Sequence, residues 1–218
     1  MHAILLDFNG TMFLDSSLHL EAWSRIYHVL HPEAACSPDP DLFCGPRNDA
    51  ILQSIAPWLT AAERTRYSEE KEAIYRMACK VNTEITHLVP GVEDFLTHLQ
   101  QCNIPVILVS ASIKENIDFY FDTFGLDRWL DRNLVVFDDG TYADKRQMYL
   151  EAARRLNTEI KDCLIVEDSP SSVSLARQLN PACIVAVGNT APAARLLQLG
   201  ADHYVSDFSE FDYAWLEH

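Results

Sequence analysis

Short apolar runs that alternate with helical segments are the feature that most constrains the fold of this chain. The runs cover residues 3–6, 104–109, 134–137, 164–166, 184–187 and 203–205. Helical patterns separate the later runs and cover residues 92–101, 113–124, 145–156, 171–179 and 191–199. Buried strands of a parallel sheet appear as continuous apolar runs, and intervening helices of about 10 residues are typical of right-handed βαβ units. The pattern therefore predicts an α/β fold with a parallel sheet.

A helical block interrupts this alternation after the first apolar run. Residues 17–30, 47–55 and 60–82 have helical patterns, and Thr60 and Glu63 have the spacing of a capping box. None of the apolar runs falls between residues 17 and 86. We therefore expect a core made of residues 1–15 and 87–218 and an inserted helical cap made of residues 16–86.

The charge and cysteine content exclude several classes of protein. The 218 residues include 17 basic and 32 acidic side chains, a net charge of −15. That balance opposes binding to nucleic acid and to anionic membranes, because both depend on Lys and Arg. The six cysteines contain no C-x-x-C pair, and no apolar run has transmembrane length. Because Met1-His2 leads directly into the first run, we expect no signal peptide. We expect a protein of the reducing cytoplasm, and the sequence leaves the oligomeric state open.

Polar side chains follow three of the predicted strands at the point where each strand ends. Asp7 and Asn9 follow the first run, Ser110 follows the run at 104–109, and Glu167 and Asp168 follow the run at 164–166. A lysine, residue 145, begins the next helix after a turn. In open α/β sheets ligands bind beyond the carboxyl ends of the strands. Carboxylates from two strand ends suit Mg²⁺, and with a hydroxyl and an ammonium they are the groups needed for phosphoryl transfer.

These motifs resemble those of the haloacid dehalogenase superfamily, in its branch with a helical cap near β-phosphoglucomutase-like phosphatases. Four motifs occur in order over the whole chain: Asp7-Phe8-Asn9-Gly10-Thr11, Val106 to Ser110, Lys145, and Leu164-Ile165-Val166-Glu167-Asp168. The resemblance implies a Rossmann-like parallel sheet core, an Mg²⁺ cofactor and a small phosphorylated metabolite, such as a sugar phosphate, as substrate.

The resemblance also implies a role for individual residues. Asp7 would be the nucleophile, Ser110 would bind the transferring phosphoryl group, and Lys145 would neutralise its charge. Asp168, Asp7 and the backbone carbonyl of Asn9 would bind Mg²⁺, with Glu167 assisting. Further contacts to the substrate are expected from Gly10, Thr11 and Ala111, and from His19 and Arg47 in the cap. Residues 45–48, Gly-Pro-Arg-Asn, occupy the place of the family's cap specificity loop.

One residue departs from the family pattern at the place where it matters most. Asn9 stands where the family's phosphatases and mutases have an Asp that acts as general acid and base. An amide cannot transfer that proton, and general acid–base catalysis contributes about 10²–10⁴-fold. Relatives without this Asp include dehalogenases and phosphonoacetaldehyde hydrolases. However, dehalogenases lack the acidic pair Glu167-Asp168, and neither Lys71 nor Lys80 lies in a phosphonatase motif.

Two functions remain open on these residues. The first is an Mg²⁺-dependent phosphatase or phosphotransferase that forms an aspartyl-phosphate on Asp7, slowed by Asn9. The alternative is a phosphate-binding or regulatory protein of the same fold with little turnover. Asn48 lies where mutase relatives carry a cation, which weakens the mutase assignment.

Overall fold

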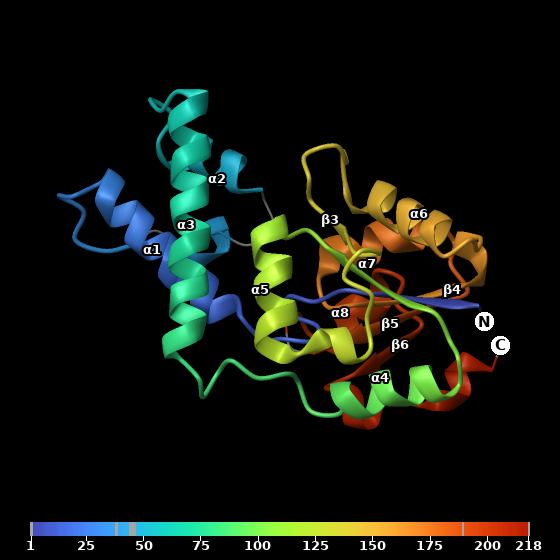
Figure 1. Ribbon diagram of the computed structural model, residues 1–218. Coiled ribbons are helices and arrows are strands. Elements are labelled where there is room, and N and C mark those ends of the chain that lie inside the picture. Colours follow the sequence, from blue (N-terminus) through green and yellow to red (C-terminus); the bar gives the residue numbers. More distant parts are fainter. Residues whose placement is uncertain (1, 38, 44–46, 189, 218) are drawn as a thin grey trace. The chain divides into compact units, whose positions relative to one another are not determined.

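The computed structural model describes residues 2–37, 39–43, 47–188 and 190–217 (Figure 1). The chain divides into two compact units, one formed by Met1–Leu14 with His87–His218 and the other by Asp15–Thr86. The division expected from the sequence placed Asp15 in the first unit. Its side chain instead belongs to the second unit, where it accepts a hydrogen bond of 2.6 Å from the Tyr75 hydroxyl.

The first unit alternates strands and helices, and it contains the following elements (Figure 1): β1 (Ala3–Leu6), α4 (Val92–Gln101), β2 (Val106–Ser110), α5 (Lys114–Phe124), η2 (Leu126–Arg128), β3 (Val136–Phe137), α6 (Lys145–Arg155), η3 (Ile160–Asp162), β4 (Cys163–Glu167), α7 (Pro170–Arg177), β5 (Cys183–Val187), α8 (Ala193–Gln198), β6 (His203–Val205), η4 (Phe208–Glu210) and η5 (Tyr213–Leu216). This order confirms the α/β class predicted from the apolar runs.

All the strands pair in parallel, in the order β3-β2-β1-β4-β5-β6. The strand order reverses between β1 and β4, which is where α/β sheets of this order bind ligands. The register places Leu6 opposite both Leu108 of β2 and Val166 of β4. The residues that follow these three strands therefore emerge at the same level of one sheet edge.

Burial explains why the strands lack a polar face. Every residue of β1, β4 and β5 is buried, as expected for central strands with helices packed against them. The α5 helix ends at Gly125, which has the left-handed φ of +62° that favours glycine. The run predicted as a strand at 134–137 is shorter in the structure, because Leu134 belongs to a turn in which its N–H donates to the Asp131 carbonyl.

The second unit is helical, with α1 (Ser16–Leu30), η1 (Pro40–Phe43), α2 (Asn48–Ile55) and α3 (Ala61–Val81). The predicted capping box is confirmed: the Thr60 hydroxyl accepts from the Glu63 N–H, and the Glu63 carboxylate accepts from the Thr60 N–H at 2.8 Å. Trp23 is buried and stacks on Phe43 inside the core of this unit. None of the described helices has the length and hydropathy needed to cross a bilayer.

Candidate active site

The predicted site residues of the first unit gather at the carboxyl edge of its sheet. Asp7 directly follows β1, Ser110 ends β2, Glu167 ends β4, and Lys145 is the first residue of α6. These side chains are separated by up to 160 residues of sequence, and the parallel strand order brings them together.

Asp7 is held at both of its carboxylate oxygens. Lys145 Nζ lies 2.6 Å from Asp7 Oδ1, and the Thr11 hydroxyl donates to Asp7 Oδ2 at 3.0 Å. Asp7 is only 4% exposed, and Thr11 is fully buried. A carboxylate fixed at both ends in this way has one orientation, which is what a positioned nucleophile requires.

The electrostatics of Asp7 show that the site is short of positive charge. Burial raises the pKa of Asp7 well above its ordinary value, and the neighbouring Glu167 and Asp168 carboxylates raise it further, whereas Lys145 opposes them. Burial alone would lower the pKa of Lys145, but attraction by Asp7 and Glu167 outweighs burial and raises it. Lys145 therefore remains an ammonium ion that faces the carboxylates of Asp7 and Glu167.

These three carboxylates have the chemistry of a divalent cation site. Asp7, Glu167 and Asp168 each offer an oxygen, and the three oxygens lie within 4.8 Å of one another. All three residues are buried, and Lys145 forms ion pairs with two of them, Asp7 and Glu167. Hard oxygen ligands with an excess of negative charge fit Mg²⁺. The residues present therefore fit the metal that the sequence motifs implied.

Side chains from outside the motifs hold two of these carboxylates. The buried Tyr149 hydroxyl, one turn along α6 from Lys145, donates to Glu167. The Thr190 hydroxyl donates to Asp168. Neither residue was singled out from the sequence. Tyr149 lies on the same face of its helix as Lys145, four residues later, and that spacing is the signal that would have found it.

Gly10 is required by the close approach of its backbone to Asp168. Its φ is +78°, and a Cβ atom built on it would lie 2.2 Å from Asp168 Oδ2. Any larger residue would displace this carboxylate. The glycine of the first motif therefore gives the sheet edge the room for the acidic cluster.

Asn9 is tied into a network of hydroxyl groups. Its Oδ1 accepts from Ser110 Oγ at 3.1 Å and from Ser112 Oγ at 2.9 Å. Its Nδ2 donates to the Tyr120 hydroxyl at 2.7 Å. Ser112 and Tyr120 were not identified as site residues from the sequence, although Ser112 lies only two residues after Ser110.

Three predicted substrate contacts remain. Ala111 directly follows Ser110 at the end of β2 and is exposed, whereas His19 and Arg47 belong to the second unit. His19 is half-buried there: Lys71 Nζ lies 2.8 Å from His19 Nδ1, and His19 Nε2 lies 3.2 Å from Asp15. Since an ammonium group can only donate, Nδ1 is the acceptor and the imidazole proton sits on Nε2. Gly45 and Pro46, predicted to form a specificity loop with Arg47, lie outside the described residues.

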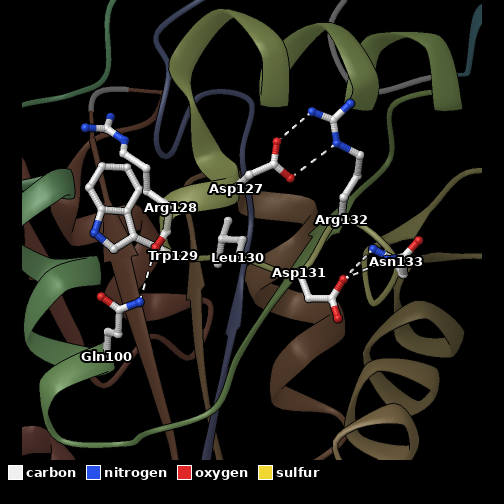
Figure 2. Close-up of a pocket in the computed structure, with 8 residues that line it drawn as sticks. All are labelled: Gln100, Asp127, Arg128, Trp129, Leu130, Asp131, Arg132 and Asn133. Carbon is white, nitrogen blue, oxygen red and sulfur yellow. Dashed lines mark hydrogen bonds and ion pairs between the residues drawn. The ribbon is translucent and has the colours of Figure 1, made fainter.

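A cavity of about 410 Å³ has a lining that includes none of these groups. Figure 2 shows the residues that line it. Its lining consists of Gln100 and Asp127–Asn133. The charged groups in the lining pair with one another or with nearby residues, as in the ion pair between Arg132 and Asp127. The cavity contains none of the predicted site residues.

Comparison with known proteins identifies the family of this chain. The model of the haloacid dehalogenase-like hydrolases matches residues 1–180. Validoxylamine A 7'-phosphate phosphatase of Streptomyces hygroscopicus subsp. limoneus is 23% identical over 210 residues, which cover 94% of this chain and 93% of that protein. A HAD hydrolase of family IA, variant 3, from Entamoeba histolytica has a TM-score of 0.90 at 26% identity, covering 100% of this chain and 98% of that chain. β-Phosphoglucomutase from Clostridium difficile has a TM-score of 0.80 at 21% identity, covering 100% and 96%.

Proposed function

The chain belongs to the haloacid dehalogenase-like hydrolases, and we propose that it is a phosphatase that uses Asp7 as its nucleophile. Membership confirms the family resemblance and the hydrolase class that the motifs predicted. One observation carries the proposal: the buried Asp7 carboxylate is held by Lys145 and Thr11 beside two further carboxylates at the sheet edge.

The proposed reaction has two displacements at phosphorus. An oxygen of Asp7 attacks the phosphomonoester, and the bond between phosphorus and the leaving alcohol oxygen breaks. The alcohol departs with the bonding electrons and takes up a proton. Water then attacks the phosphorus of the aspartyl-phosphate and loses a proton to solvent. The bond between phosphorus and the Asp7 oxygen breaks, which releases phosphate and restores the carboxylate. Lys145 balances the negative charge of the phosphoryl group, and the Ser110 hydroxyl orients it.

The acidic cluster supports the assignment of a Mg²⁺ cofactor. Asp7, Glu167 and Asp168 would hold the ion, with the backbone carbonyl of Asn9 as a further ligand. When bound, Mg²⁺ supplies positive charge that offsets the charge of the phosphate oxygens and of the carboxylates. Tyr149 and Thr190 hold Glu167 and Asp168 in place for this role.

Asn9 sets the expected rate and leaving-group preference. Its amide offers no proton to the leaving oxygen, so that proton comes from water. The loss of a general acid lowers turnover by about 10²–10⁴-fold for alcohols that are poor leaving groups. Activated esters, which need no proton, should be hydrolysed fastest.

The proposed substrate is a small phosphorylated metabolite of the sugar phosphate type. The relative from Streptomyces hygroscopicus is named as a phosphatase of validoxylamine A 7'-phosphate, a small phosphorylated molecule. His19 and Arg47 of the second unit are the proposed contacts to the part of the substrate that is not transferred. We further propose that the unit Asp15–Thr86 is the cap domain.

The decisive experiment removes the nucleophile and compares it with a matched control. Wild-type protein, Asp7→Asn and Asp138→Asn are assayed against p-nitrophenyl phosphate and a panel of sugar phosphates, with Mg²⁺ and with EDTA. Asp138 is the control because the stretch from Asp138 to Thr141 imitates the first motif, yet its carboxylate accepts a turn hydrogen bond from Gly140.

We expect Mg²⁺-dependent turnover in the wild type and in Asp138→Asn, and turnover below detection in Asp7→Asn. Intact mass spectrometry of acid-quenched wild-type protein should reveal a species heavier by one phosphoryl group, absent from Asp7→Asn. Equal activity of wild type and Asp7→Asn would refute the proposal.

The second candidate, a phosphate-binding protein with little turnover, is favoured by the amide at position 9. The variant Asn9→Asp separates the two functions. A gain of about 10²-fold or more in hydrolysis of sugar phosphates identifies the amide as the limit on an enzyme. Phosphate binding in Mg²⁺ with no gain in hydrolysis supports the binding protein.

A further inference from the structure

A buried tyrosine hydroxyl reaches the phosphoryl-binding edge, and the proposed reaction does not use it. Tyr120 belongs to α5 and is fully buried. Its ring stacks on Phe8, which lies between Asp7 and Asn9, with ring centroids 4.3 Å apart and planes inclined by 22°. The stacked rings give the hydroxyl a fixed position, and it meets Asn9 Nδ2 at 2.7 Å.

The chemistry of the groups determines the direction of each hydrogen bond. An amide nitrogen can only donate, so the Tyr120 oxygen accepts from Asn9. An amide oxygen can only accept, so both serine hydroxyls donate to Asn9 Oδ1. The Ser112 N–H in turn donates to Ser110 Oγ at 3.2 Å. The Ser112 hydroxyl also lies 3.3 Å from the Tyr120 hydroxyl. The network thus joins Tyr120 to Ser110 through Asn9 and Ser112.

The orientation of Ser110 follows from this network. Its single proton is directed at Asn9 Oδ1, and one of its lone pairs receives the Ser112 N–H. The Asn9 amide and the Ser112 N–H therefore fix the position of Ser110 Oγ, and Tyr120 fixes that amide. A phosphoryl oxygen can only accept, so the Ser110 hydroxyl would turn its proton from Asn9 Oδ1 to that oxygen while Oγ keeps its place. Without Tyr120, the Asn9 side chain would have several rotamers from which to meet Ser110.

We propose that Tyr120 and Ser112 are positioning residues that hold the Asn9 amide and, through it, the position of Ser110 Oγ. The inference rests on the proposed function, because that function makes Ser110 a ligand of the phosphoryl group. It also gives the Asn9 amide a role of its own. The amide both donates and accepts hydrogen bonds within the site, which an ionised carboxylate cannot do.

The test is a double-mutant cycle with Tyr120→Phe and Asn9→Ala. The phenylalanine keeps the stacked ring and removes only the hydroxyl. Removal of one hydrogen bond should lower kcat by about 2- to 12-fold with little change in KM, because the bond positions a group that contacts the transferring phosphoryl. Ser112→Ala should give a loss of similar size. Tyr213→Phe, which removes a hydroxyl from η5 outside the site, should match the wild type.

Coupling between the variants separates positioning from general loss of structure. If Tyr120 acts through Asn9, then Tyr120→Phe causes no further loss of kcat in the Asn9→Ala background. Independent, multiplicative losses in the double variant would overturn the inference. Wild-type kcat in Tyr120→Phe would overturn it as well.

A binding measurement distinguishes failure of this inference from failure of the proposed function. If Asp7→Asn retains full turnover, the proposed function fails, and the network is judged by the affinity for inorganic phosphate in Mg²⁺, measured by calorimetry. Tyr120→Phe should then weaken phosphate binding about 2- to 12-fold only when Asn9 is present. Equal phosphate affinity in wild type and Tyr120→Phe, or no phosphate binding by the wild type, would overturn the inference.

Discussion

Substitution of Gly10 by alanine tests whether the backbone of the first motif makes room for the acidic cluster. The left-handed φ of +78° costs an alanine about 1–2 kcal/mol. The added Cβ would also lie 2.2 Å from Asp168 Oδ2 and 2.7 Å from its Cγ, where ordinary van der Waals contact begins at 3.4 Å. Overpacking of this kind costs about 1–3 kcal/mol. We therefore expect Gly10→Ala to lower the free energy of unfolding by about 2–5 kcal/mol.

Two other glycines provide matched controls. Gly140 has a φ of +84°, and no atom of the described residues lies within 4 Å of the position that a Cβ would take there. Gly140→Ala should therefore cost only the backbone strain of about 1–2 kcal/mol. Gly91 has a φ of +81°, and a Cβ there would lie 2.3 Å from the Ser209 nitrogen. Gly91→Ala should therefore destabilise the protein at least as much as Gly10→Ala while leaving the acidic cluster untouched.

The assay combines urea unfolding, followed by circular dichroism, with the Mg²⁺ concentration that gives half-maximal activity. The Mg²⁺ concentration for half-maximal activity should be at least about tenfold higher in Gly10→Ala than in the wild type. A displacement of Asp168 that weakens Mg²⁺ binding by about 1.4 kcal/mol lowers the affinity tenfold. Both controls should keep the Mg²⁺ requirement of the wild type. A Gly10→Ala protein with the stability of Gly140→Ala and an unchanged Mg²⁺ requirement would refute the reasoning.

Two further predictions follow from the electrostatics of the first unit. Hydrogen bonds from the arginines at positions 154 and 155 lower the pKa of Glu151 to about 2. Its ion pairs therefore stabilise the fold above the ordinary pKa of 4.5 and lose this effect as the pH falls towards 2. Because Glu151 is partly exposed, Glu151→Gln should lower the free energy of unfolding by about 0.5–1 kcal/mol at pH 7 and by less at pH 3, measured in urea. An equal loss at both pH values would contradict the lowered pKa of Glu151. Burial raises the pKa of the Cys163 thiol to about 11. Iodoacetamide at pH 8 should therefore alkylate the exposed Cys102 and leave the buried Cys163 unmodified, as measured by peptide mass spectrometry. Alkylation of both cysteines at equal rates would show that Cys163 is accessible.

Local signals in the sequence predicted most of the secondary structure. The capping box of Thr60 and Glu63 marked the start of α3, and Gly125 marked the end of α5. Such signals depend on residues within one or two turns of each other, so a single sequence displays them. The short β3 was overpredicted because Leu134 and Val135 have the same apolar character as a strand, although Leu134 is bonded in a turn.

The supporting contacts of the site could not be predicted in this way. The Tyr120 hydroxyl meets Asn9 across 111 positions of sequence, and the Thr190 hydroxyl meets Asp168 across 22. Both contacts depend on the strand order and on the rotation of a helix or loop about its own axis. Neither the strand order nor this rotation can be deduced from a periodicity or motif in the sequence.

The sequence by itself determined which reactive groups follow β1, β2 and β4, because each apolar run ends abruptly in a polar residue. The tertiary structure alone decided how those groups meet. It buried Asp7 beside Glu167 and Asp168, and the burial together with these two neighbouring charges raises the pKa of Asp7 against the opposing effect of Lys145. It also joined the Asn9 amide to Tyr120 and Ser110. The reason is physical: the order of residues along a strand is local, whereas the charge and hydrogen bonding of a buried site are sums over every element packed around it.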